Sequence, residues 1–309
     1  MALDLTTKVI LTALAIAMPQ IALADELEPR PAAGGELFYS SDSEDTEILR
    51  TAIDFDLRNQ GKDRRLGVRV ENAWYDPAGS GQTQRQRIFL QAADRSGNWN
   101  WAARVGTDGD TIIGSASLHD NSKFRKEVFI ERDIVETRQG LDQGIYSTFA
   151  GAAIDLPLND RNIVTALVGL QAFTGDNVRT HLRGNYVHVL KPDWGLSVQL
   201  RGRYFRSSDP REFDYYSPKW YAEAMPVVQL RRFVDGWEVV GAGGIGVQRD
   251  SATDWRQSNF AQFRVRSPEN AKHWSLTAEI TYTDTPSDSA SAGSSYSYFQ
   301  TRLGIMRRF

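Results

Sequence analysis

The sequence has no cysteine among its 309 residues. This absence excludes a disulfide framework and every metal or redox site that depends on thiolate ligands. After the N-terminal residues 1–24, no run approaches the roughly eighteen apolar residues of a membrane-spanning helix. The formal net charge of −3 is small and gives no reason to expect a nucleic acid as a partner. No phosphate-binding loop, nucleotide fingerprint or metal-ligand cluster stands out either, so we expect no cofactor and no metal.

The N-terminal residues have the pattern of a secretory signal peptide. Lys8 precedes a largely apolar run, Val9–Met18, and Ala22-Leu23-Ala24 forms an A-x-A cleavage site. We therefore expect residues 1–24 to be a signal peptide, with cleavage after Ala24. The run is too short to cross a bilayer, so the mature chain is expected in the periplasm, outside the cell or in the outer membrane.

What the sequence does have is alternation of apolar and polar residues, in segments of about ten residues separated by turn-forming clusters. In one segment Leu196, Val198 and Leu200 share a face, and Gln199 and Arg201 share the opposite face. Clear segments of this kind occupy residues 49–57, 66–74, 99–105, 124–130, 194–204, 237–247, 274–282 and 297–309. Weaker candidates lie near Phe38, Ile88, Ile112, Phe149, Val164, Leu182, Val227 and Phe263. The alternation predicts about sixteen β-strands.

Such strands, in an exported chain whose mean hydropathy is −0.44, are typical of a barrel, because half of each strand faces a wet lumen. We predict an all-β fold: a transmembrane antiparallel β-barrel of about sixteen strands (roughly 14–18) in the Gram-negative outer membrane. Residues 36–309 would form the barrel as one domain, and residues 25–35 a flexible periplasmic leader. A barrel of this size encloses an aqueous lumen, so the chain is expected to be a pore in contact with outer-membrane lipid.

The last segment ends on Phe309, the C-terminal residue. A terminal aromatic on such a strand resembles the C-terminal signature of bacterial outer-membrane barrels, where it is the signal for the barrel-assembly machinery. The resemblance implies that role for Phe309. For this segment alone, an edge strand of a soluble sandwich is the alternative.

Several short stretches resemble the barrel domain of outer-membrane exopolysaccharide exporters, the group that includes the poly-N-acetylglucosamine and cellulose secretion porins and related phage-adsorption barrels. The stretches are residues 38–43, 131–137, 175–179, 215–221 and the glycine-rich 241–246. The resemblance implies a sixteen-stranded barrel with a polysaccharide in transit through its lumen. Members typically carry a tetratricopeptide scaffold before the barrel, which this chain has no room for. A separately encoded periplasmic scaffold and an inner-membrane synthase are therefore expected partners.

The candidate site is the set of side chains that would line the pore and contact the polymer. They are Arg69, Glu71, Arg104, Arg179, Arg183, Arg201, Arg203, Glu238, Glu279, Tyr216 and Trp220. Guanidinium and carboxylate groups hydrogen-bond sugar hydroxyls, although such groups also simply brace a wet lumen. Arg201 and Arg203 beside Arg179 and Arg183 form the most concentrated basic wall, which favours an anionic solute unless neighbouring carboxylates neutralise it.

The segment Tyr215–Tyr221 has two interpretations. Its aromatic side chains could form a platform for sugars at a pore mouth, or they could belong to an aromatic girdle at the membrane interface. Its proline interrupts a strand ladder, so we expect a loop or the start of a strand here.

Other functions remain as alternatives. A general or solute-specific diffusion porin would have a constriction loop and a trimer-forming surface, neither of which is visible in the sequence. A lipid- or sugar-modifying enzyme would need a catalytic set on the barrel, but the four histidines (His119, His181, His188 and His273) have no serine motif beside them. A phage receptor would need long exposed loops. We expect a pore for exopolysaccharide secretion and not an enzyme.

Overall fold

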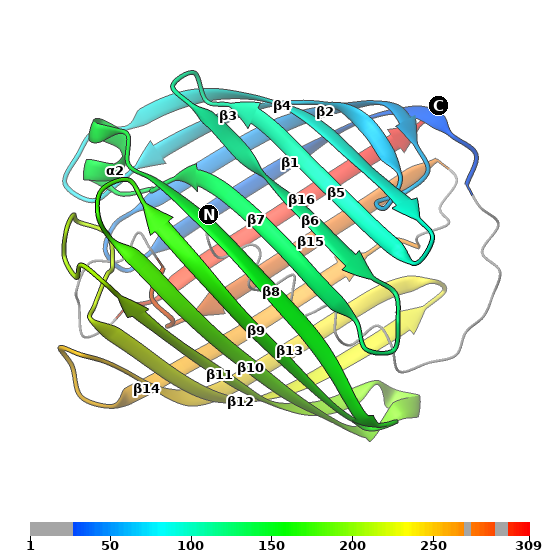
Figure 1. Cartoon of the computed structure of the whole chain (residues 1–309). Helices are drawn as coiled ribbons and strands as arrows, with labels where there is room; N and C mark the ends of the chain where they lie inside the picture. The colour runs from blue at the N-terminus through cyan, green and yellow to red at the C-terminus, as the bar shows by residue number, and fades with distance from the viewer. Residues whose placement is uncertain (1–26, 269–272, 288–295) are drawn as a thin grey trace.

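The described residues, 27–268, 273–287 and 296–309 of a computed structural model, form sixteen antiparallel strands that close into one barrel (Figure 1). The strands are β1 (Arg30–Asp42), β2 (Glu47–Asn59), β3 (Arg65–Asp76), β4 (Thr83–Ser96), β5 (Trp99–Thr107), β6 (Ile112–Asp120), β7 (Lys126–Ile134), β8 (Tyr146–Asn159), β9 (Asn162–Phe173), β10 (Val178–Lys191), β11 (Leu196–Ser207), β12 (Trp220–Val234), β13 (Trp237–Asp250), β14 (Arg256–Arg266), β15 (Trp274–Thr283) and β16 (Tyr298–Arg308). All sixteen predicted strands are present, so the predicted fold class is confirmed. The predicted signal peptide lies outside the described residues.

Each strand pairs with its neighbours in sequence, and β1 pairs with β16 to close the barrel. Closure matters because lipid cannot hydrogen-bond a free backbone edge. Side chains then alternate between lipid and lumen. On β2, Ile53 is 71% exposed on the outer face, whereas its neighbour Asp54 is 6% exposed and points inward. The period-two pattern of the sequence is therefore the direct result of one apolar and one polar environment.

The outer face can be tested with a charge at its centre. We expect Ile53→Arg, in the middle of β2, to lower the free energy of unfolding by about 2–4 kcal/mol, because the guanidinium would meet hydrocarbon. Urea titration of the barrel in lipid vesicles, followed by tryptophan fluorescence, measures this loss. Leu57→Arg is the matched control, since Leu57 is on the same face but near the strand end; it should cost about 0–1 kcal/mol. Equal losses at both positions would contradict the assignment of the lipid face.

Aromatic side chains on the outer face gather near both ends of the barrel. One group lies at the end where β1 begins and β16 ends: Trp99, Trp101, Trp194, Trp237, Trp274 and Phe309. The other lies at the opposite end: Trp74, Tyr204, Trp220, Trp255, Tyr282 and Phe299. Girdles of this kind mark the two membrane–water interfaces, so an apolar band lies between them. None of the described helices is long and apolar enough to cross a membrane.

The barrel begins earlier in the sequence than predicted. Residues 30–35, which we expected in a flexible leader, belong to β1, and Ala32 pairs with Arg308 of β16. Gly34 and Gly35 suggest flexibility in the sequence, but the packing of β1 against its neighbours requires glycine. A Cβ on Gly34 would lie 2.2 Å from the carbonyl oxygen of Ile305. The missing side chain therefore permits the close approach of β1 to β16.

We expect Gly34→Ala to lower the free energy of unfolding by about 1–3 kcal/mol, because the added methyl overpacks the β1–β16 contact. The same vesicle titration measures the loss. Gly241→Ala on β13 is the control, since a Cβ there has no heavy atom within 4 Å. A Gly34 variant as stable as the Gly241 variant would show that the β1–β16 contact can accommodate the added methyl group.

The two ends of the barrel differ in their connections. At the end where β1 begins and β16 ends, two-residue turns join β4 to β5, β8 to β9 and β12 to β13. At the opposite end, residues 135–145 join β7 to β8 and residues 208–219 join β11 to β12. The first of these contains the short helix α2 (Arg138–Gln143), which lies at the barrel end opposite the C-terminus (Figure 1). The long connections thus sit at the end that is extracellular in outer-membrane barrels.

Candidate functional site: the lumen of the barrel

One side of the lumen, formed by the inward faces of β1–β4 and β7, is a lattice of ion pairs that we call the paired wall. Its centre is Arg69, which is 6% exposed. Its guanidinium lies 2.7 Å from Glu36, 3.1 Å from Asp54 and 3.1 Å from Glu71. The three carboxylates come from three different strands, so the lattice ties β1, β2 and β3 together.

Arg87 extends the paired wall from β4 to β7. It is 2% exposed on β4 and lies 3.0 Å from Glu71. On its other side, one guanidinium nitrogen lies 2.8 Å and 2.7 Å from the two carboxylate oxygens of Asp133 on β7. A buried arginine between two carboxylates keeps its charge compensated, so this pairing braces β4 against β7.

Residues 135–145, which we call the α2 segment, fold into the lumen. Glu136 forms an ion pair with Arg50 of β2, and Arg85 of β4 donates a hydrogen bond of 3.1 Å to the carbonyl oxygen of Leu141. The segment also contributes Leu141 to a buried cluster of inward side chains. The other members are Phe38, Ile48, Ala73, Tyr75 and Phe89 of β1–β4, and Ile113, Ile134 and Tyr146 of β6–β8. Since β2 and β7 are separated by four strands, these contacts require the α2 segment to reach across the pore.

Local sequence explains the shape of the α2 segment. Thr137 caps the helix, because its Oγ1 accepts a hydrogen bond of 3.0 Å from the backbone N–H of Gly140. Gly144 ends the helix in the left-handed conformation, at φ 69°. Thr137 and Gly144 are typical residues for the two ends of a helix, so they could have predicted a short helix here. The alternation of the strands gives no sign of it.

Residues 208–219, which we call the tyrosine segment, also turn inward. Tyr216 is 5% exposed, and its hydroxyl donates a hydrogen bond of 2.7 Å to Asp250. Burial raises the pKa of this phenol, so it stays a neutral donor. Arg179 donates to the carbonyl oxygen of Tyr216, and the ring of Tyr215 stacks on Phe173 with centroids 4.1 Å apart. The segment is thus held against β9, β10 and β13.

Asp214 joins the two inward segments to each other. Its carboxylate accepts hydrogen bonds from the Thr137 hydroxyl, at 2.6 Å, and from the backbone N–H of Gln139, at 2.8 Å. Its own backbone N–H donates to the Gln139 side chain at 3.1 Å. We call these three hydrogen bonds the latch. Because each segment is anchored to a different side of the barrel, the latch bridges the lumen.

The structure places most predicted site residues on the inner face. Arg179 and Arg183 point inward from β10. Arg201 and Arg203 point inward from the neighbouring strand β11, where Arg203 is opposite Arg183. This surface, formed by β10 and β11, is called the arginine wall. Their contact with a polymer remains a prediction.

Three further predicted residues lie elsewhere on the inner face. Arg104 on β5 lies over the Phe89 ring, with 5.3 Å between the guanidinium carbon and the ring centroid. Glu238, near the start of β13, lies 2.7 Å from Arg231. Glu279 accepts a hydrogen bond of 3.1 Å from Gln262. They lie on β5, β13 and β15, so the predicted set does not converge on one site but is spread around the lumen.

Trp220 is not in the lumen. It begins β12, where Tyr221 points inward, so Trp220 faces outward beside Arg249, whose guanidinium carbon lies 5.7 Å from its ring centroid. The pore-lining position predicted for Trp220 is therefore incorrect, because the chain has already entered the strand and alternation turns the side chain to the membrane interface. Phe309 is exposed at the outer rim, and its backbone N–H donates a hydrogen bond of 3.0 Å to Pro31.

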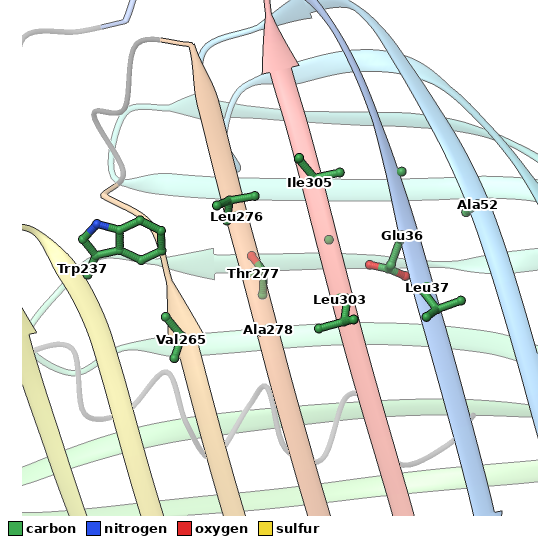
Figure 2. Close-up of a pocket in the computed structure, with 12 residues that line it drawn as sticks. Glu36, Leu37, Ala52, Trp237, Val265, Leu276, Thr277, Ala278, Leu303 and Ile305 are labelled. Carbon is green, nitrogen blue, oxygen red and sulfur yellow. The ribbon is translucent and has the colours of Figure 1, made fainter.

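The groove in Figure 2 lies where β1 and β16 close the barrel, and Glu36 of the paired wall is among the residues that line it. Its walls are outward apolar side chains of β1 and β13–β16: Leu37, Trp237, Val265, Leu276, Leu303 and Ile305. The small residues Gly35 and Ala278 leave the depression between them. Its apolar lining faces the side that lipid covers. Among the residues that the structure describes, no cluster of histidine and carboxylate groups could hold a metal ion.

Neither a protein-family model nor a curated protein matches the sequence. Among solved structures, the chain is similar to one described as a bacterial polysaccharide outer membrane secretin, with a TM-score of 0.65 and 14% identity over 92% of this chain and 99% of that one. OccK5 (OpdH) of Pseudomonas aeruginosa gives a TM-score of 0.44 at 8% identity, over 91% and 98% of the two chains. OmpT of Vibrio cholerae gives 0.42 at 8% identity, over 92% and 100%. The first likeness shows that the chain has the fold of an outer-membrane β-barrel.

Proposed function

We propose that this protein is an outer-membrane pore through which an exopolysaccharide is secreted. The observation that carries the proposal is a closed barrel of sixteen strands among the described residues, with a polar interior, that superposes along most of its length on a polysaccharide outer membrane secretin. A barrel of this size leaves an aqueous lumen, whereas eight strands would be filled by side chains. The inward arginines, carboxylates and amides offer hydrogen bonds to a hydrated polymer at many heights.

Transport would be passive guidance. Many weak contacts let a chain slide without being trapped, which is the requirement for any conducting pore. The free energy for movement would come from polymer synthesis at the inner membrane. In the conformation described here, the α2 segment and the tyrosine segment lie across the path and are held by the latch. We infer that the latch breaks and the two segments separate during secretion, because each is anchored to its own side of the barrel.

A solute-specific diffusion porin is the second candidate. The α2 segment favours it, because a connection folded into the lumen narrows the path in the way that a constriction loop does. A narrow, charge-lined constriction suits a small solute, whereas a sliding polymer needs a wider path. The two candidates therefore differ in whether the segments open.

Measurement of secreted polysaccharide in a clean deletion strain tests the proposal. We expect loss of surface polymer and accumulation of the same polymer in the periplasm, with both restored by the wild-type gene. Unchanged secretion would refute the exporter and leave the porin. Uptake of small solutes by the same strains separates those cases, because only a porin deletion would slow uptake without altering surface polymer.

A further inference from the structure

The groove of Figure 2, which we call the closure groove, is built from two rows of outward side chains. The strand register sets the first row as Leu276, Ile305 and Gly35, and the second row, closer to the middle of the strands, as Ala278, Leu303 and Leu37. Gly35 and Ala278 keep the surface low, whereas the longer side chains rise beside them. The result is an apolar trough on the lipid face, next to the ladder that closes the barrel.

Arg307 stands at one end of the closure groove. It is the next outward residue of β16 beyond Ile305, it is exposed, and its partner in the register is Trp274 of β15. Its guanidinium carbon lies 5.3 Å from the ring centroid of Trp274 and 5.4 Å from that of Phe309. Both rings belong to the aromatic girdle at the end where β1 begins, so the guanidinium lies at the level of the membrane–water interface.

The charge of Arg307 is available to a ligand. Among the residues that the structure describes, Arg307 forms no ion pair. The aromatic faces beside it hold a cation in place without supplying a full negative charge. Glu36 also lines the groove, but its carboxylate lies 2.7 Å from the guanidinium of Arg69 on the lumenal side. The closure groove therefore combines an apolar body with a positive group at its water-facing end.

We propose that the closure groove binds one phospholipid, with an acyl chain in the trough and its phosphate on Arg307. A phospholipid has the same two parts as the groove, in the same order along the membrane normal. Guanidinium donors match phosphate oxygens in a two-point contact. Because the long connections mark the extracellular end, Arg307 lies at the periplasmic end, and the lipid belongs to the inner leaflet. The site is on the outer face, so it is independent of what crosses the lumen.

A second copy of the chain fits this face less well than a phospholipid. In a two-fold dimer with both barrels upright in one membrane, the same patch of each copy meets its counterpart. The Arg307 side chains of the two copies would then lie at the same height with no carboxylate between them. A phosphate instead supplies the negative charge that Arg307 lacks, and a single acyl chain fills the space beside Gly35.

Native mass spectrometry of the purified, folded full-length barrel tests the site. The barrel is released from detergent in the presence of increasing phosphatidylglycerol, or of a diacylglycerol that has the same acyl chains and no phosphate. We expect one phosphatidylglycerol to bind more tightly than any that follow it. The diacylglycerol should bind at least about fivefold more weakly, because the contact between the phosphate and Arg307 is absent. Added salt should weaken the binding of phosphatidylglycerol.

Two pairs of variants separate the phosphate contact from the trough. Arg307→Gln should weaken phosphatidylglycerol at least about fivefold and leave the diacylglycerol unchanged. Lys191→Gln is its control, since Lys191 is an exposed cation over the Trp194 ring at the same end of the barrel but away from this groove. Ala278→Phe fills the trough and should weaken both lipids, whereas Ala152→Phe, on the outer face of β8, should weaken neither. Circular dichroism checks that each variant is folded, and Arg307→Lys should retain most of the affinity because it keeps the charge.

A phospholipid with a photoreactive acyl chain locates the bound lipid in vesicles. We expect its cross-links to gather on β15, β16 and β1 of the wild type and to fall there in Ala278→Phe. Equal binding of phosphatidylglycerol and diacylglycerol would overturn the proposal, as would full affinity in Arg307→Gln or cross-links spread evenly around the barrel. A dimer that excludes lipid, and that is lost in Ala278→Phe, would assign the face to a second copy instead.

Discussion

Replacing Arg87 by alanine is expected to lower the free energy of unfolding of the barrel by about 3–5 kcal/mol. The substitution leaves Glu71 without one of its two partners and Asp133 without both of its short guanidinium contacts. Asp133, which is 6% exposed, cannot recover that interaction from bulk water. Urea titration in lipid vesicles, with tryptophan fluorescence as the signal, measures the loss.

Arg95 offers the matched control on the same strand. It pairs with Asp63 at 2.7 Å, but both side chains are substantially exposed, at 48% and 30%. We expect Arg95→Ala to cost less than about 1 kcal/mol, since exposed ion pairs contribute little. Replacing Arg87 by Met and Asp133 by Leu together should recover part of the loss, because the unpaired charge of Asp133 is removed as well. A loss below about 1 kcal/mol for Arg87→Ala would show that lumen water solvates the paired wall.

Breaking the latch is expected to increase the ionic current through the pore. Asp214→Ala removes the acceptor for two hydrogen bonds between the α2 segment and the tyrosine segment. Hydrogen bonds to a charged group contribute about 1.5–3 kcal/mol, so we expect roughly a 10- to 150-fold shift toward separated segments. Single-channel recording in a planar bilayer should show longer or larger open events than the wild type.

Two controls make the current measurement specific. Asp209→Ala changes another carboxylate of the tyrosine segment that takes no part in the latch, and it should leave the current unchanged. Thr137→Cys with Asp214→Cys introduces two thiols into a chain that has none, so a thiol-reactive cross-linker can tie the segments together and a cleavable one can release them. Current that is equal in the latch variant and the wild type, and indifferent to the cross-link, would refute gating by these segments.

The strands could be predicted because every one of them obeys the same local rule. Lipid outside and water inside impose a period of two that can be read from a dozen consecutive residues, as on β11, where Leu200 and Arg201 face opposite environments. The start of β1 was missed because Gly34 and Gly35 carry no side chain to show an alternation. Their pairing partners lie near the other end of the chain.

The inward segments could not be predicted in the same way. Asp214 and Thr137 are 77 positions apart, and Glu136 and Arg50 are 86 apart. Contacts of this kind follow from the closed barrel, which brings opposite walls within reach of one loop, and they leave no periodic trace in the sequence. The pairing of arginines with carboxylates in the paired wall has the same origin. Alternation predicts which face a residue takes, but the direction of the Glu223 carboxylate depends on the hydroxyls of Ser258 on β14 and of Thr285 just after β15.

The pairing of β1 with β16 also sets the order of assembly. Every other pair joins strands that are consecutive in the chain, so hairpins can form as the polypeptide arrives. The last ladder, with Ala32 opposite Arg308, must wait for the final residues. Until then β1 has a free edge whose backbone groups lipid cannot satisfy and another chain can capture. A chain cut short before Tyr298 lacks the partner of β1, so its sheet stays open and cannot close as a smaller pore.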